Sequence, residues 1–240
     1  MRSVISAFFL GLFLTSPSWA AFGFKDGQLS GTAMDCTGAK LLFAIVTDFS
    51  HSAATDTVTD TQSNTWTAVA NSVGGTSNSA VFYVNSTTPS VSGSMTLTVS
   101  GGAFSIAVGY CFTGTPNATI LNGHGEGNVN QNVPVTIQPG SVTPSANGAV
   151  CGTGVAATPI SGSWAVDGLY ATPIQQIIEA GASEGIAASY WIQTTATATN
   201  PTWTLASGAL FDTGQAAVIA CFALASAGTN SLTPARGFTF

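Results

Sequence analysis

The sequence predicts an all-β protein, a jelly-roll-like antiparallel β-sandwich built from two echoed halves. Segments such as Ser94–Ser100 alternate apolar with hydroxyl side chains, which is the period of two of a half-buried strand. Turn dipeptides such as Gly101-Gly102 separate these segments, and helical spacing is nearly absent. Many short strands at such intervals are typical of sandwiches and barrels.

The expected strands fall into two kinds, and each is justified by its composition. Alternating segments have one wet face and span 65–70, 80–84, 94–100, 185–194 and 202–206. Segments that are apolar on both faces are expected at the centre of a sheet and span 41–46, 104–112 and 216–224. The segment 173–179 fits a helix or a strand, and 133–138 is expected to be a short strand within a long polar crossover over 114–147.

The two halves of the chain repeat one plan. Phe104–Phe112 is echoed by Gln215–Phe222, and Ala80–Ser86 by Ala188–Thr194, which defines halves of about 30–113 and 140–224. Each half has too few expected strands to close its own core. We therefore predict one double-sheet domain over 21–240.

The doubly apolar segments need cover on their outer faces. Candidates are Phe22 and Phe24 near the start, Phe238 and Phe240 at the end, or a neighbouring subunit. Because exposed apolar surface usually marks an interface, we expect a homo-oligomer or a larger assembly.

Residues 1–20 have the features of a signal peptide. A short, weakly positive start precedes the apolar run Val4–Leu14, and Ser18 and Ala20 supply the small residues of a cleavage site after Ala20. The alternatives are a membrane anchor, for which the run is short, and an apolar N-terminal plug in an assembly. With no comparable run later, we expect no stable membrane span, and a secreted or cell-surface location. A phage virion is the alternative.

Four cysteines in an exported chain predict two disulfides. Three pairings are possible, and the echo favours one of them: if the first strand of each half lies antiparallel to its last strand, Cys36 is near Cys111 and Cys151 is near Cys221. Each bridge then closes a loop of about 70 residues, which contributes roughly 4 kcal/mol by the chain-entropy account. The alternative is four small buried hydrophobic residues in a reducing compartment.

The composition is poor in charge. Only 6% of residues are charged, with four Lys+Arg against ten Asp+Glu, while 45% are hydrophobic. Phosphate binding needs clustered Lys and Arg, so we expect no nucleic-acid partner. Hydroxyls, amides and backbone must make up most of the polar surface.

No residue pattern specifies catalysis, so we expect no enzyme, no cofactor and no metal. Gly181–Gly185 matches the nucleophile-elbow pattern around Ser183, but a β-rich segment follows in place of the required helix. No strand carries the closely spaced carboxylates that sandwich glycosidases use. A hydrolase is therefore the last alternative.

Two oxygen-rich clusters are candidate calcium sites. One combines Asp48, Asp56 and Asp60 with His51, and the other combines His124 with Glu126 in the Gly123–Gly127 segment. Neither has the Asp-x-Asp-x-Asp-Gly spacing of a calcium loop. Turn chemistry, in which Asp side chains bond the local backbone, is the favoured interpretation.

Three tryptophans are candidate ligand-binding residues because indole faces stack on sugar rings. If Ile186, Ala188, Tyr190 and Ile192 face inward, Trp191 faces outward beside Ser189 and Gln193. Trp164 and Trp66 are the other candidates. Core or interface packing is the alternative for all three.

Three segments carry a resemblance to Thr/Ser/Gly-rich β-sandwich proteins of bacteria and tailed phages: Thr59–Trp66, Gly140–Gly148 and Ile192–Thr204. Those proteins are uncharacterised and are taken to be structural or surface components. The resemblance implies a fold rather than an active site. From it and the residues we expect a non-catalytic structural or adhesive protein that self-assembles, with a carbohydrate-binding module as the alternative.

Overall fold

A computed structural model describes residues 21–49, 52–102, 104–129, 136–159, 163–178, 184–205 and 210–225. Within these ranges every paired strand is antiparallel, and the helical structure is one short 3₁₀ turn, Ala53–Thr55. The predicted all-β class is confirmed. The predicted signal peptide and the tail residues Phe238 and Phe240 lie outside the described residues.

The described residues form sixteen strands, eight in each half. The first half contains β1 Gly23–Leu29, β2 Ala33–Asp35, β3 Leu41–Phe49, β4 Thr57–Asp60, β5 Trp66–Gly74, β6 Ser77–Val84, β7 Ser94–Ser100 and β8 Ile106–Thr113. The second contains β9 Pro116–Val129, β10 Thr136–Ile137, β11 Val150–Pro159, β12 Trp164–Val166, β13 Ile174–Ile178, β14 Glu184–Ile192, β15 Trp203–Leu205 and β16 Leu210–Leu224. The segment that fitted a helix or a strand is the strand β13.

The two halves have the same topology, strand for strand. The first half forms a five-stranded sheet in the order β1-β8-β3-β6-β5 and a three-stranded sheet in the order β2-β7-β4. Adding eight to each number gives the second half, with the orders β9-β16-β11-β14-β13 and β10-β15-β12. Pairing of the first strand with the eighth, the second with the seventh and the third with the sixth is the nested order of a jelly roll.

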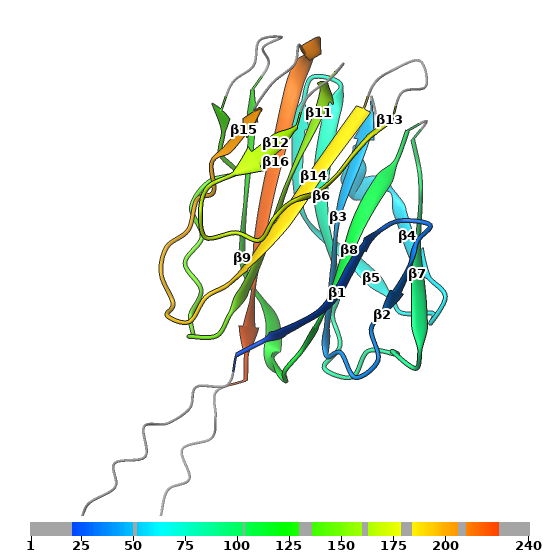
Figure 1. Cartoon of the computed structure of the whole chain (residues 1–240), viewed down its shortest axis with the longest axis vertical. Helices are drawn as coiled ribbons and strands as arrows, with labels where there is room; N and C mark the ends of the chain where they lie inside the picture. The colour runs from blue at the N-terminus through cyan, green and yellow to red at the C-terminus, as the bar shows by residue number, and fades with distance from the viewer. Residues whose placement is uncertain are drawn as a thin grey trace, which may run out of the picture.

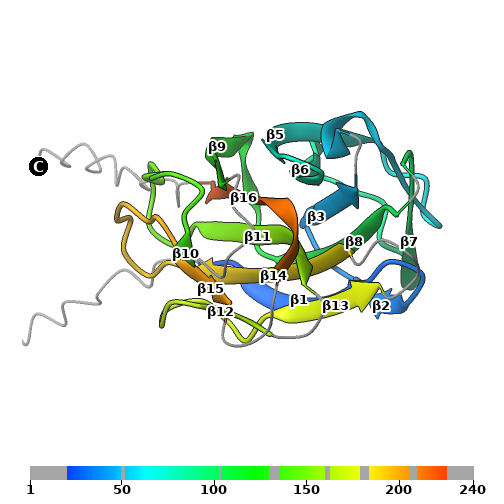
Figure 2. The ribbon, with the colours of Figure 1, turned by 90° about the horizontal axis from the view of Figure 1, so that it is seen from above.

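The sheets stack in four layers, three-stranded, five-stranded, five-stranded and three-stranded (Figures 1 and 2). A central core lies between the two five-stranded sheets, where Phe43 of β3 stacks on Phe222 of β16 with ring centroids 5.1 Å apart. Each half has a further core between its own two sheets, around Leu42 and Leu97 in the first half and around Trp203 in the second.

The four-layer arrangement corrects the expected number of strands and the expected cover of the apolar strands. The sequence patterns predict too few strands in each half, because strands of two to four residues such as β10 and β12 carry too little periodicity to recognise. The three-stranded sheets formed by these short strands cover the outer faces of the doubly apolar strands from within the chain. Phe22 joins the central core rather than an outer face, and oligomerisation no longer follows from uncovered apolar strands.

Strand β9 also differs from the prediction made from the sequence. Its residues were expected to belong to a crossover, because glycines and polar side chains dominate the segment. The chain near Pro139 crosses β9 so closely that a side chain at Gly125 or Gly127 would collide with the backbone of Gln138 and Pro139. Glycines therefore occur in β9 because the crossing chain leaves no room for side chains.

The structure pairs Cys36 with Cys111 and Cys151 with Cys221, as the echo of the two halves predicts. The second bridge joins directly opposed residues of the neighbouring strands β11 and β16. In the first bridge, Cys36 follows β2 and reaches Cys111 on β8 from outside the sheet. Both cystines are fully buried.

Two disulfides are compatible with an extracellular location. In the ranges that the structure describes, no helix is long and apolar enough to cross a membrane.

Candidate sugar-binding pocket

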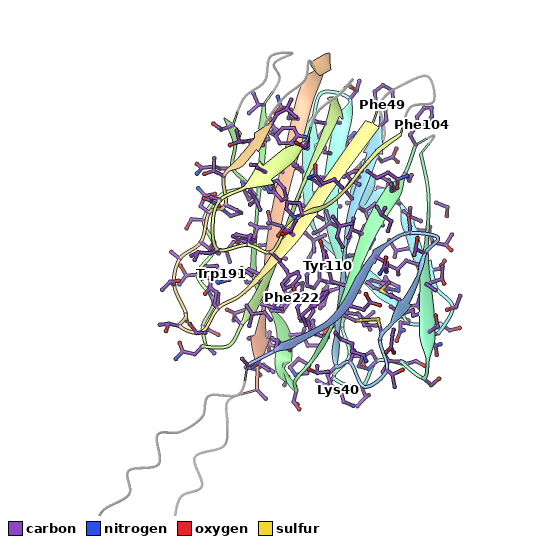
Figure 3. The ribbon with its side chains drawn as sticks, viewed as in Figure 1. Lys40, Phe49, Phe104, Tyr110, Trp191 and Phe222 are labelled. Atoms are coloured by element: carbon purple, nitrogen blue, oxygen red, sulfur yellow. A yellow bond between two sulfur atoms is a disulfide. The ribbon has the colours of Figure 1, made fainter. Side chains whose placement is uncertain are left out.

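Trp191 is on the outward face of β14. The inward face of this strand carries Ile186 and Ala188 in the central core, with Tyr190 packed against them, as the alternation predicts. Figure 3 places Trp191 at the side of the molecule, away from the interior occupied by Tyr110 and Phe222. Trp191 is half-buried, so part of its indole face is accessible to a ligand.

A pocket of about 310 Å³ opens over this indole. One wall is the loop between β12 and β13, which supplies Asp167, Leu169 and Tyr170. The opposite wall is the loop between β14 and β15, represented by residues 197–201. Its volume is at the small end of the 300–1,000 Å³ range typical of ligand pockets.

Two aromatic rings face this pocket at an angle. The ring centroids of Tyr170 and Trp191 lie 6.0 Å apart, with an interplanar angle of 57°. Leu169 adds an apolar side chain that is 67% exposed. Rigid aromatic surface combined with accessible apolar surface is suited to stacking on the apolar face of a ligand ring.

Polar groups complete the lining. The Tyr170 hydroxyl and Thr199 Oγ1 are 2.9 Å apart in a hydrogen bond, which fixes the phenol ring. Asn200 also lines the pocket, and its buried Oδ1 has no partner among the described residues. Asp167 is exposed at the same wall. The pocket thus offers one carboxylate, one amide and hydroxyls around an aromatic floor.

The Tyr170 phenol stays neutral. Burial raises its pKa well above the ordinary value, and the negative charge of Asp167 raises it further, although the hydrogen bond with Thr199 acts in the opposite direction. A neutral phenol can both donate and accept hydrogen bonds. Tyr170 therefore supplies an aromatic surface and a polar tip at every physiological pH.

The other two tryptophans pack against the cores of the two halves. Trp164 is only 4% exposed in the core of the second half, which fits core packing, the alternative to ligand binding. Trp66 is half-buried against the core of the first half, and its Nε1 donates to Asp60 Oδ2 at 2.7 Å. Ser189 and Gln193, expected to be exposed beside Trp191, are fully buried under the pocket loops.

The first half has a pocket at the equivalent position. In the second half, Cys221 on β16 lies opposite Cys151 on β11, which lies opposite Trp191 on β14. In the first half, the same two strand pairings lead from Cys111 on β8 across β3 to Val84 on β6. Val84 lines a hollow of about 560 Å³ between the β4–β5 and β6–β7 loops. Its other lining residues are hydroxyl, amide and proline residues without an aromatic ring: Ser63, Asn64, Thr65, Thr67, Asn85, Ser86, Thr88, Pro89 and Ser90. Only the second-half pocket has a stacking surface.

The acidic cluster of the first half does not assemble as a single site. Asp48 and Asp56 are buried beside the consecutive glycines Gly102 and Gly101. Asp60 lies at the far end of β4, about 13 Å from Asp56 along the extended chain. It accepts hydrogen bonds from the backbone N–H groups of Gln62 and Asn64, as turn chemistry predicts.

His124 and Glu126 share one exposed face of β9. Glu126 Oε2 accepts the backbone N–H of Asn71 at 3.0 Å, and Ser72 Oγ donates to Gly127 O at 2.6 Å. These bonds join the edge strand β5 of one half to β9 of the other, and the two strands lie side by side in Figure 2. The geometry assigns Glu126 to the contact between halves.

No group of three or more His, Cys, Asp or Glu side chains with metal-binding geometry occurs in the described ranges. His51 and Ser183, which were weighed as calcium-site and catalytic candidates, lie outside the described residues.

Comparison with protein-family models, with curated proteins and with solved structures finds no match to this chain. The resemblance to bacterial and phage β-sandwich proteins therefore stays a prediction.

The sequence pattern predicts Trp191 as a pocket residue but not Tyr170, Asp167 or Asn200. These residues come from loops on either side of β14, and their proximity depends on the pairing of short strands that the sequence did not reveal. A usable signal was the turn-forming segment Asp167-Gly168 followed by two large apolar residues.

Proposed function

We propose that this protein is a secreted, non-catalytic carbohydrate-binding protein that acts at a surface as an adhesive component. The observation that carries the proposal is the pocket in which Trp191 and Tyr170 face one another beside Asp167 and Asn200. A sugar ring has an apolar face, which stacks on an aromatic side chain, and a rim of hydroxyls, which bind carboxylate, amide and hydroxyl groups.

The scaffold supports a binding role for this pocket. The inward residues of β14 and the buried residues Ser189 and Gln193 fix the strand that carries Trp191. Gln193 also holds the β14–β15 loop in place, because its Oε1 accepts the Thr197 N–H at 3.1 Å. A preformed pocket loses little conformational entropy when a ligand binds.

Two disulfides and the signal-like segment 1–20 support secretion. Extracellular sugar-binding proteins meet their ligands on cell surfaces and in matrix polymers, where an adhesive function needs no chemistry beyond binding.

The direct test is glycan-array screening of the purified, oxidised protein, followed by calorimetry with the best ligand. We expect Trp191→Ala to weaken binding about tenfold or more, the loss expected for truncation of a central aromatic contact. Trp191→Phe should retain part of the affinity because it keeps a stacking ring. Asn85→Ala, in the first-half pocket, is the matched control and should bind as the parent does.

Equal binding by Trp191→Ala and the parent would refute this pocket as the sugar site. Thermal unfolding of each variant distinguishes lost contact from lost fold.

A structural, self-assembling subunit is the second candidate function, on the cell surface or in a phage virion. One outer face supports it, since exposed hydroxyls of Thr57, Thr59, Thr98 and Ser100 project from the paired strands β4 and β7 without a charge among them. Such a face can pack against a copy of itself without burying ions. Light scattering after size-exclusion chromatography would detect the oligomer.

A further inference from the structure

The described lining of the Trp191 pocket presents one acidic group, the exposed carboxylate of Asp167, among neutral polar side chains. A carboxylate only accepts hydrogen bonds, so it favours ligands that bring O–H or N–H donors. The neutral groups of the lining, which include the Thr199 hydroxyl and the Asn200 amide, can both donate and accept.

Among the residues that the structure describes, no cation in the pocket balances this carboxylate. The described lining contains neither Lys nor Arg. The two lysines in the described ranges belong to the first half, where Lys25 binds Asp35 at 2.7 Å and Lys40 lies between β2 and β3. A ligand carboxylate or sulfate would therefore face Asp167 without a compensating charge.

Building on the proposed function, we infer that this pocket selects sugars that present hydroxyl or ammonium donors, and that Asp167 makes it discriminate against acidic sugars. Neutral and amino sugars offer O–H or N–H groups to the Asp167 carboxylate. Uronic acids, sialic acids and sulfated sugars bring further acceptors and a like charge.

The magnitude follows from the exposure of Asp167. An exposed carboxylate acts through high-dielectric solvent, so its effect on a charged ligand is several-fold in affinity and weakens as salt is added. The Thr199 and Asn200 side chains are neutral and act on a ligand regardless of its charge. Charge discrimination should thus be salt-sensitive, whereas binding of neutral sugars should not be.

The test uses two matched series of sugars, the gluco series and the galacto series, each with an amino, an N-acetylamino and a uronic acid form. Dissociation constants are measured by calorimetry or by ligand-observed NMR for the parent and for Asp167→Asn. In the parent we expect the uronate of the recognised series to bind several-fold more weakly than the neutral sugar, and the amino sugar at least as tightly.

Asp167→Asn should bring the three affinities of that series together, because the amide oxygen still accepts a hydrogen bond but carries no charge. The hydrogen bonds from Leu169 and Tyr170 to the Asp167 backbone carbonyl are independent of the side chain, so the loop is retained.

Uronate binding equal to that of the neutral sugar in the parent would overturn the charge selection while leaving the sugar-binding function intact. Charge selection would also be overturned if Asp167→Asn left the ratio of uronate affinity to neutral-sugar affinity unchanged. Binding of none of the six sugars and of no array glycan would overturn both proposals.

Discussion

The two halves of this molecule share one topology, yet they differ at the same position of the fold. Residue 191 on β14 is tryptophan, and its counterpart on β6 is Val84. The β12–β13 loop of the second half places Tyr170 against that tryptophan. In the first half, Asn64 of the β4–β5 loop instead donates to Asp60 at the end of β4 and holds the turn.

This difference shows where a repeated fold allows divergence. The paired five-stranded sheets and their shared core constrain the inward residues of both halves, so these stay apolar in each. The loops carry no such constraint and are where binding groups are usually found. One half can therefore hold a ligand while the other serves as scaffold.

The central core is the strongest link between the halves, and disrupting it should have the largest effect. Phe43 stacks on Phe222 and fills the space left by Gly152, whose missing side chain admits its ring. We expect Phe43→Ala to lower the free energy of unfolding by about 3–5 kcal/mol. Guanidinium denaturation measures this change in the free energy of unfolding. A decrease of less than about 1 kcal/mol would mean that this contact does not join the halves.

Removing each disulfide in turn compares the halves directly. The cystines span 75 and 70 residues, so the chain-entropy account assigns nearly equal contributions to the Cys36–Cys111 and Cys151–Cys221 bridges. We expect each Cys→Ala double variant to lose about 2–4 kcal/mol. Denaturant unfolding of both variants gives the comparison.

A markedly larger loss for one bridge would show that its local packing, rather than loop closure, determines its contribution. The Cys151–Cys221 pair is then the one to examine, because its sulfurs pack against Val142 and Ile219 in a small cluster.

The smallest effect concerns an ion pair of the first half that has no counterpart among the described residues of the second. The Lys25 ammonium and the Thr37 N–H hold the pKa of Asp35 at about 2. Because the folded pKa is depressed, the stabilisation is complete above the ordinary pKa near 4 and disappears as pH falls through about 2. Lys25→Met should lower stability slightly at pH 7 and not at all below pH 2.

Acid titration of both proteins, followed by circular dichroism, checks this sign. A difference that grows as the pH falls would contradict it. Added salt should shrink the difference at pH 7, since both side chains are partly exposed.

The sequence contained enough information for the fold class, the central strands and both disulfide pairings. Leu41–Val46 and Phe104–Phe112 are apolar on both faces, which predicts a strand in the middle of a sheet with both faces buried. The cysteine pairing followed because β3 and β11 lie antiparallel to β8 and β16, as the echo implied.

The layers and most of the pocket could not be predicted. Strands such as β12 and β15 are three residues long, which is too short for a period of two to be recognised, so the outer sheets were missed. Tyr170, Asp167 and Asn200 meet only because those strands bring two loops together. A contact between loops leaves no periodic trace in the sequence.

The most direct test of the account is a crystal structure of the oxidised protein grown with the best-binding neutral oligosaccharide. We predict a sugar ring against Trp191 and Tyr170, with a hydroxyl donating to the Asp167 carboxylate, and no sugar in the first-half pocket beside Val84. A ring bound in the first-half pocket, with Trp191 left bare, would contradict the assignment of binding to the second half.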